Sequence, residues 1–187
     1  MIELLKNIDT RLFLFFNGNH TPFMDTVMGL ATDKFTWIPL YLLILFFVWR
    51  KSKSRAWLVV LSVAILITLS DQVSVQLFKE TFQRYRPCHN LLLQGQVHLI
   101  DGKCGGPYGF VSSHAANTFA LITFLSFYFR NKGFALGMYI WAAFVSYSRV
   151  YAGVHYPFDI VGGMFVGMVL GVIGYKIYFR LDKKYAE

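Results

Sequence analysis

Charged residues are scarce in this chain: only 15% of its 187 residues are Asp, Glu, Lys or Arg, whereas 56% are hydrophobic. An average soluble domain carries about a quarter charged residues. The hydrophobic residues also gather in long runs and do not alternate with polar ones. We therefore expect an integral membrane protein and, at this length, a single domain over residues 1–187.

Acidic residues are especially few, ten against eighteen Lys and Arg, which gives a formal net charge of +8. A basic balance can indicate a nucleic-acid partner, but here the positive charges cluster at the ends of apolar runs. Lys and Arg in such short loops mark the cytoplasmic side of a membrane protein. The pattern predicts the lipid bilayer as a partner and no nucleic acid. The clusters lie at residues 50–55, 130–132 and 176–184.

The first sixteen residues lack the short basic start and uninterrupted apolar core of a cleavable signal peptide. Charged and apolar residues are mixed there, which predicts an amphipathic helix in the membrane interface. The next apolar stretch, residues 22–31, is too short to cross a membrane alone. It either lies in the interface or completes a sixth crossing with the residues before it. We expect residues 1–33 to form these N-terminal helices.

Five longer apolar stretches have the composition of membrane-spanning helices, which need about 20 residues. The first of them is short and depends on its flanks. The sequence thus predicts an all-α, polytopic membrane helix bundle with five to six transmembrane helices and a core over residues 34–180. The last stretch repeats small residues at every fourth position, which lets two helices pack closely. The stretches are Phe35–Trp49, Trp57–Phe78, Ser112–Phe129, Phe134–Tyr151 and Phe158–Phe179, and the small residues are Gly163, Gly167 and Gly171.

If the basic clusters are cytoplasmic, the polar loop 79–113 and the turn around residues 153–156 lie on the external face. In a bacterium this is the periplasmic side of the inner membrane. Both cysteines, Cys88 and Cys104, fall in this loop, and an even number in an oxidising compartment favours a disulfide. The alternative is a Cys/His zinc site with His89 or His98, although the spacing matches no common zinc pattern.

Three short segments place reactive side chains on this external face. In the first, Lys79 and Arg86 are seven residues apart, which predicts that they share one helical face before Pro87 ends the helix. The second segment, residues 112–114, reads Ser-Ser-His and opens an apolar helix. A helix N-terminus presents free N–H groups and is a natural anion site.

The third segment joins two helices, with Arg149 at the end of one and Pro157 at the start of the next. His155 and Asp159 are four residues apart around that start, so their side chains can meet. A carboxylate that holds one imidazole nitrogen orients the other for attack. Ionisable residues gathered at one membrane face predict a functional site.

These segments resemble the signatures of the type 2 phosphatidic acid phosphatase family, which is related to the vanadium haloperoxidases. The family's first signature, Lys, six residues, Arg-Pro, is matched by residues 79–87. Its third, Ser-Arg, five residues, His, three residues, Asp, is matched by residues 148–159. Its second, normally Pro-Ser-Gly-His, reads Val111-Ser112-Ser113-His114, so the proline and the glycine are replaced. The resemblance covers roughly residues 57–174.

The resemblance implies a membrane lipid phosphatase that works through a phosphohistidine. His155 would attack phosphorus, Asp159 would fix its tautomer, and His114 would protonate the leaving oxygen. Three cations would take the place of a metal, so neither a metal nor a cofactor is expected. The groups that would bind the phosphate oxygens are Lys79, Arg86, Ser112, Ser113 and Arg149.

The family's bacterial members act on polyprenyl diphosphates, lipid A phosphates, phosphatidylglycerol phosphate and phosphatidic acid, and the residues alone do not choose among these substrates. Arg84 is an additional cation that we expect to contact a headgroup. Two alternatives stay open. One is a non-catalytic lipid-phosphate binder or transporter on the same scaffold. The other is a vanadate-dependent haloperoxidase, which five apolar spans disfavour.

Overall fold

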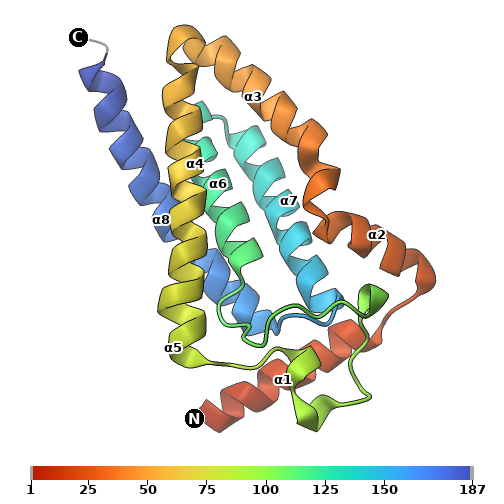
Figure 1. The fold of residues 1–187 in the computed structure, drawn as a ribbon. Coiled ribbons are helices and arrows are strands. Elements are labelled where there is room, and N and C mark those ends of the chain that lie inside the picture. The colour runs from red at the N-terminus through yellow and green to blue at the C-terminus, as the bar shows by residue number, and fades with distance from the viewer. Residues whose placement is uncertain (1, 186–187) are drawn as a thin grey trace.

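The computed structural model describes residues 2–185, which form helices joined by short turns and one long polar loop (Figure 1). This confirms the all-α prediction. A π-helical segment, η3, prolongs α4 into the short helix α5. The helices are α1 (Ile2–Gly18), α2 (Pro22–Thr32), α3 (Ile38–Ser52), α4 (Ala56–Gln72), η3 (Val73–Lys79), α5 (Glu80–Phe82), α6 (Ser113–Phe129), α7 (Lys132–Tyr151) and α8 (Pro157–Lys184). The 3-10 turns are η1 (Lys34–Trp37), η2 (Lys53–Arg55), η4 (Pro87–His89), η5 (Leu91–Leu93) and η6 (Ile100–Gly102).

Helix α6 forms the centre of the bundle, and α4, α7 and α8 pack around it (Figure 1). Nine of its seventeen residues are buried. The outer faces of α3, α4 and α8 instead expose large apolar side chains such as Leu42, Leu61 and Phe165. A continuous apolar exterior of this size is unfavourable in water, so these faces are suited to contact with lipid.

Two helical runs, Lys34–Phe82 and α8, are long and apolar enough to cross a membrane by length and composition. The first run consists of two antiparallel limbs, α3 and α4, which turn back on each other at Lys53 (φ 46°). With α6 and α7, five helices run along the bundle, as the apolar stretches predicted. The three basic clusters lie toward the end of the bundle that carries this turn (Figure 1), where Arg55 pairs with Asp182 at 3.1 Å.

Helix α1 lies across the opposite end of the bundle, beneath the long polar loop (Figure 1). One face, formed by Asp9, Phe13 and Asn17, is fully buried. The apolar residues predicted to face the interface, among them Leu4 and Phe15, are exposed. The helix therefore presents its apolar side outward and directs two polar side chains into the protein.

Helix α2 stays at the same end as α1 and does not cross the bundle. Its 11 residues span about 16 Å, roughly half of a hydrocarbon core. Asp25 accepts a hydrogen bond from Tyr151 at 2.7 Å, and Thr32 accepts one from Arg149 at 2.6 Å. Because these partners lie in the last turn of α7, α2 is fixed beside that end of the bundle, and the interfacial location of residues 22–31 stays a prediction.

The glycines of α8 form the contact with α6. A methyl group at Gly163 would lie 2.5 Å from the carbonyl oxygen of Ser112, and one at Gly171 would lie 2.7 Å from that of Ala120. At Gly167 it would overlap the carbonyl oxygen of Ala116. The expected close packing of two helices is confirmed, and it brings the first turns of α6 and α8 together.

Candidate functional site

His155 and Asp159 form a buried pair at the start of α8. The turn after α7 ends at Pro157, the first residue of α8, and this places Asp159 at the third position of the helix. One oxygen of Asp159, Oδ2, accepts a hydrogen bond from the N–H of Tyr156 at 3.0 Å and lies 3.3 Å from Nδ1 of His155. His155 is 2% exposed and Asp159 is fully buried. The carboxylate thus caps the helix and holds the imidazole at the same time.

The free nitrogen of His155, Nε2, faces Arg86. A terminal nitrogen of the guanidinium lies 3.5 Å from it, while Nε of Arg86 donates to the carbonyl oxygen of Tyr108 at 3.2 Å. With its proton on Nδ1 toward Asp159, the imidazole directs an unprotonated Nε2 toward the cations. This is the arrangement of a nucleophile beside an anion site.

Arg86 does not share a helical face with Lys79, and that part of our prediction was wrong. The helix ends at Phe82, because Gln83 adopts a left-handed conformation (φ 44°). The backbone then runs extended: the N–H of Arg86 donates to Pro107, and the N–H of Gly109 donates to Arg84, at 2.9 and 2.8 Å. Pairing with the returning end of the loop, rather than helical periodicity, carries Arg86 into the site.

Gly109 is required by the closeness of this pairing. A methyl group there would lie 2.9 Å from Oδ2 of Asp159 and 3.2 Å from Cγ of Arg86. Real side chains do not approach so closely. The backbone of the loop therefore passes directly over the His155–Asp159 pair, and only a glycine fits.

Lys79 and the start of α6 supply the next group of donors. Nζ of Lys79 donates to the hydroxyl of Ser113 at 2.8 Å. Ser112 is the N-cap of α6, where its hydroxyl accepts from Ala115 at 3.5 Å, as expected. His114 lies in the first turn and is exposed, in agreement with the position predicted for it.

Arg149 comes from the last turn of α7 and, with Arg86, lines a cavity of about 820 Å³. Its Nε is buried and has no protein partner among the described residues. The guanidinium therefore keeps a donor available for a ligand. The rest of the cavity wall comes from α2, η1 and the loop, and includes Asp25, Asp33 and Asp101.

Arg84 has a different position from the one we expected. One terminal nitrogen donates to Oδ1 of Asp159 at 2.8 Å and the other donates to Oδ2 of Asp9 at 2.7 Å. Its guanidinium also lies over the ring of Tyr156, 4.1 Å from the centroid. Arg84 is thus paired with two carboxylates and is not directed toward a headgroup.

Electrostatics keep His155 neutral. Burial disfavours the imidazolium, and the nearby Arg86, Arg149 and Lys79 repel it, so the pKa of His155 lies well below its ordinary value of 6.5. A neutral imidazole beside three cations has an unprotonated nitrogen with which it can act as a nucleophile.

The two cysteines are joined in a disulfide that ties η4 to the segment after η6. Because the sulfurs are bonded to each other, they do not serve as thiolate ligands with His89, which lies beside them. His98 pairs with Asp25 at 2.9 Å and stacks on His20. The structure therefore favours the disulfide over the zinc alternative.

Comparison with known proteins agrees with this geometry. Residues 55–183 match the sequence model of the PAP2 superfamily. The chain belongs to this superfamily. It is 39% identical to a lipid A 4'-phosphatase of Bacteroides thetaiotaomicron over 98% of this chain and 81% of that protein. It is 36% identical to the lipid A 4'-phosphatase of Porphyromonas gingivalis, over 95% and 75% of the two chains.

A solved structure shares the fold. The PAP2-type phosphatidylglycerolphosphate phosphatase of Bacillus subtilis superposes with a TM-score of 0.71 at 18% identity, covering 97% of this chain and 87% of that one. At this identity the likeness concerns the fold alone. It agrees with a multi-pass membrane protein whose helices follow the order described above.

Proposed function

We propose that this protein is a membrane lipid phosphatase that removes the 4'-phosphate of lipid A at the external face of the bacterial inner membrane. The observation that carries the proposal is the buried His155–Asp159 pair, whose free imidazole nitrogen faces Arg86 at 3.5 Å. The two lipid A 4'-phosphatases similar over nearly the whole chain support the choice of substrate.

The reaction proceeds in two displacements. Nε2 of His155 attacks phosphorus, a P–N bond forms, and the P–O bond to the sugar breaks while His114 gives its proton to the leaving oxygen. Water then attacks the phosphohistidine, the P–N bond breaks, and the proton lost by the water returns to His114. Lys79, Arg86 and Arg149 stabilise the charge on the phosphate oxygens throughout, which is the main contribution that a protein makes to phosphoryl transfer.

The cavity beside the cations favours a sugar headgroup. Arg86, Arg149 and Lys103 line it, and Asp25, Asp33 and Asp101 contribute carboxylates. Carboxylates accept hydrogen bonds from hydroxyl groups and repel a second phosphate. The polar groups of this wall can form hydrogen bonds with the hydroxyl groups of a sugar headgroup.

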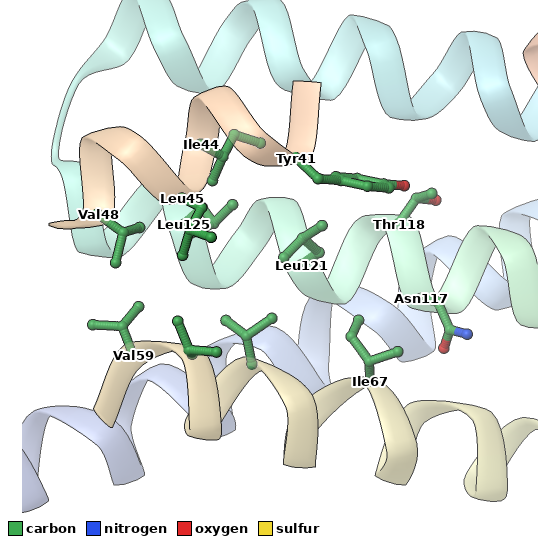
Figure 2. A pocket seen from close by; sticks show the side chains of 12 residues that line it. Tyr41, Ile44, Leu45, Val48, Val59, Ile67, Asn117, Thr118, Leu121 and Leu125 are labelled. Carbon is green, nitrogen blue, oxygen red and sulfur yellow. The ribbon is translucent and has the colours of Figure 1, made fainter. Parts of the chain in front are cut away.

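An apolar groove can hold the hydrocarbon chains of the lipid. Figure 2 shows Tyr41, Ile44 and Val48 of α3 facing Val59 and Ile67 of α4 across a space of about 410 Å³, with α6 behind it. The polar end of the groove is formed by Asn117 and Thr118, one turn beyond His114. Thr118 donates to the carbonyl oxygen of His114 at 2.8 Å. A hydrocarbon chain in this groove would have its headgroup at the catalytic end.

The proposal is tested by phosphate release from purified lipid A in detergent, with mass spectrometry to identify which phosphate leaves. We expect loss of the 4'-phosphate by the wild type and none by His155→Ala, which should remain folded. Turnover in His155→Ala would refute the nucleophile. Faster turnover of a polyprenyl diphosphate than of lipid A in a matched panel would refute the assignment of lipid A as the substrate. Binding of lipid phosphates without release of phosphate would favour the non-catalytic alternative.

A further inference from the structure

The position of Arg84 is not explained by phosphate binding. Its guanidinium bridges two carboxylates that are both fully buried, Asp9 on α1 and Asp159 on α8, at 2.7 and 2.8 Å. Asp9 and Arg84 are 75 residues apart, Asp9 lies outside the signature segments, and Arg84 stands at one of the variable positions of the first signature. A single cation between two buried carboxylates is costly to maintain, because each carboxylate has lost its water. A functional role for Arg84 and Asp9 would explain why this costly arrangement is kept.

Asp9 is fixed by a second contact. Its other oxygen, Oδ1, accepts a hydrogen bond from the N–H of Phe158 at 2.9 Å. Phe158 is the second residue of α8, directly before Asp159. Helix α1 thus holds both the first turn of α8 and the arginine that binds the catalytic carboxylate.

Arg84 binds only one of the two oxygens of Asp159. Oδ1 is held by Arg84, which leaves Oδ2 for His155 and for the N–H of Tyr156. With Oδ1 fixed, the carboxylate plane cannot turn away from the imidazole. The ring of Tyr156 beneath the guanidinium restricts the arginine in turn.

We propose that Asp9 and Arg84 are positioning residues for the nucleophile, forming a chain from α1 through Asp159 to His155. The inference rests on the proposed function, since it concerns the rate of attack by His155. Neither residue touches phosphate in this chain of contacts. Their loss should therefore lower kcat and leave KM nearly unchanged.

The first test uses two conservative variants. Asp9→Asn keeps an oxygen for the N–H of Phe158 but removes the charge that holds Arg84. Arg84→Lys keeps the positive charge but loses the two-pronged geometry. We expect kcat to fall about tenfold to a hundredfold in Arg84→Lys, a range typical for the loss of groups that orient catalytic ligands. Asp9→Asn should have a smaller effect in the same direction.

A double-mutant cycle separates positioning from general stability. If Asp9 acts on His155 through Arg84 and Asp159, Asp9→Asn lowers kcat no further once Arg84→Lys is present, because both substitutions act through one contact. Glu3→Gln is the matched control, since it breaks an exposed pair with Lys6 on the same helix and should leave kcat unchanged. Thermal unfolding of each variant reports folding.

Three results would overturn the inference. Additive effects would mean that the two residues act independently. A higher KM with normal kcat in Arg84→Lys would make Arg84 a headgroup contact. A normal kcat in a folded Asp9→Asn variant would show that Asp9 of α1 does not help to position His155. This result can be obtained even if Arg84→Lys does not fold. Turnover by His155→Ala would instead refute the proposed function, so the two failures are distinct.

Discussion

Nζ of Lys79 donates a hydrogen bond to the hydroxyl of Ser113 at 2.8 Å. Ser113 occupies the position where the family signature has glycine, so this contact is made by a side chain that the signature lacks. The hydroxyl holds the lysine at the N-terminus of α6.

Ser113→Ala should therefore weaken substrate binding more than it slows chemistry. Without the Ser113 hydroxyl, Lys79 loses its preferred orientation. We expect KM to rise about three- to tenfold and kcat to stay within about twofold of the wild-type value. This rise in KM corresponds to part of the free energy of a hydrogen bond to a charged group. Steady-state kinetics measure both constants. Ser113→Thr retains the hydroxyl and is the control; equal KM values in the alanine variant and the wild type would contradict the role.

Gly167→Ala should destabilise the bundle. The added methyl group would overlap the carbonyl oxygen of Ala116, so α6 and α8 must move apart, at a cost of about 1–3 kcal/mol. Thermal unfolding in detergent measures the effect as a lower Tm. Gly137→Ala on α7 is the matched control, because nothing lies within 4 Å of its added methyl group. Equal Tm changes in the two variants would contradict the tight contact.

His155 should make the protein less stable in acid. Its folded-state pKa lies below the ordinary value of 6.5, so the unfolded chain takes up a proton first as the pH falls through that value. Stability from this group is therefore present above about pH 6.5 and declines below it. We expect the Tm of His155→Gln to fall less than that of the wild type as the pH is lowered from about 7 to about 5. Parallel Tm–pH curves for the two proteins would exclude this effect.

Phosphate release should persist in excess EDTA. Three cationic side chains surround the proposed phosphate position, and together they supply the charge that a metal supplies in other phosphatases. The assay compares initial rates with and without chelator after dialysis. Loss of activity that added Mg²⁺ restores would show that the cations alone are insufficient.

Much of the site could be predicted because its residues lie in short segments with fixed spacing. His155 and Asp159 are four residues apart at a helix start, and local geometry alone brings them together. Ser112 and His114 likewise follow from the start of one helix. The apolar stretches predicted the five long helices because each must bury or expose a continuous face.

The remainder depended on contacts between distant segments. Asp9 contacts Arg84, 75 residues away in the sequence, and Thr32 contacts Arg149, 117 residues away. No local sequence pattern predicts either pair. Arg86 was assigned to a helix because the spacing from Lys79 fits two turns. The left-handed Gln83 ended the helix earlier, and glutamine gives no signal for that conformation.

The glycine contact between α6 and α8 has a consequence for the two histidines. His114 lies in the first turn of α6 and His155 lies two residues before α8, and the N–H of Ser112 donates to the carbonyl oxygen of Asp159 at 3.0 Å. The two histidines, the proposed proton donor and nucleophile, therefore lie on helices whose backbones are in direct contact, whereas Arg149 and Arg86 come from α7 and from the loop.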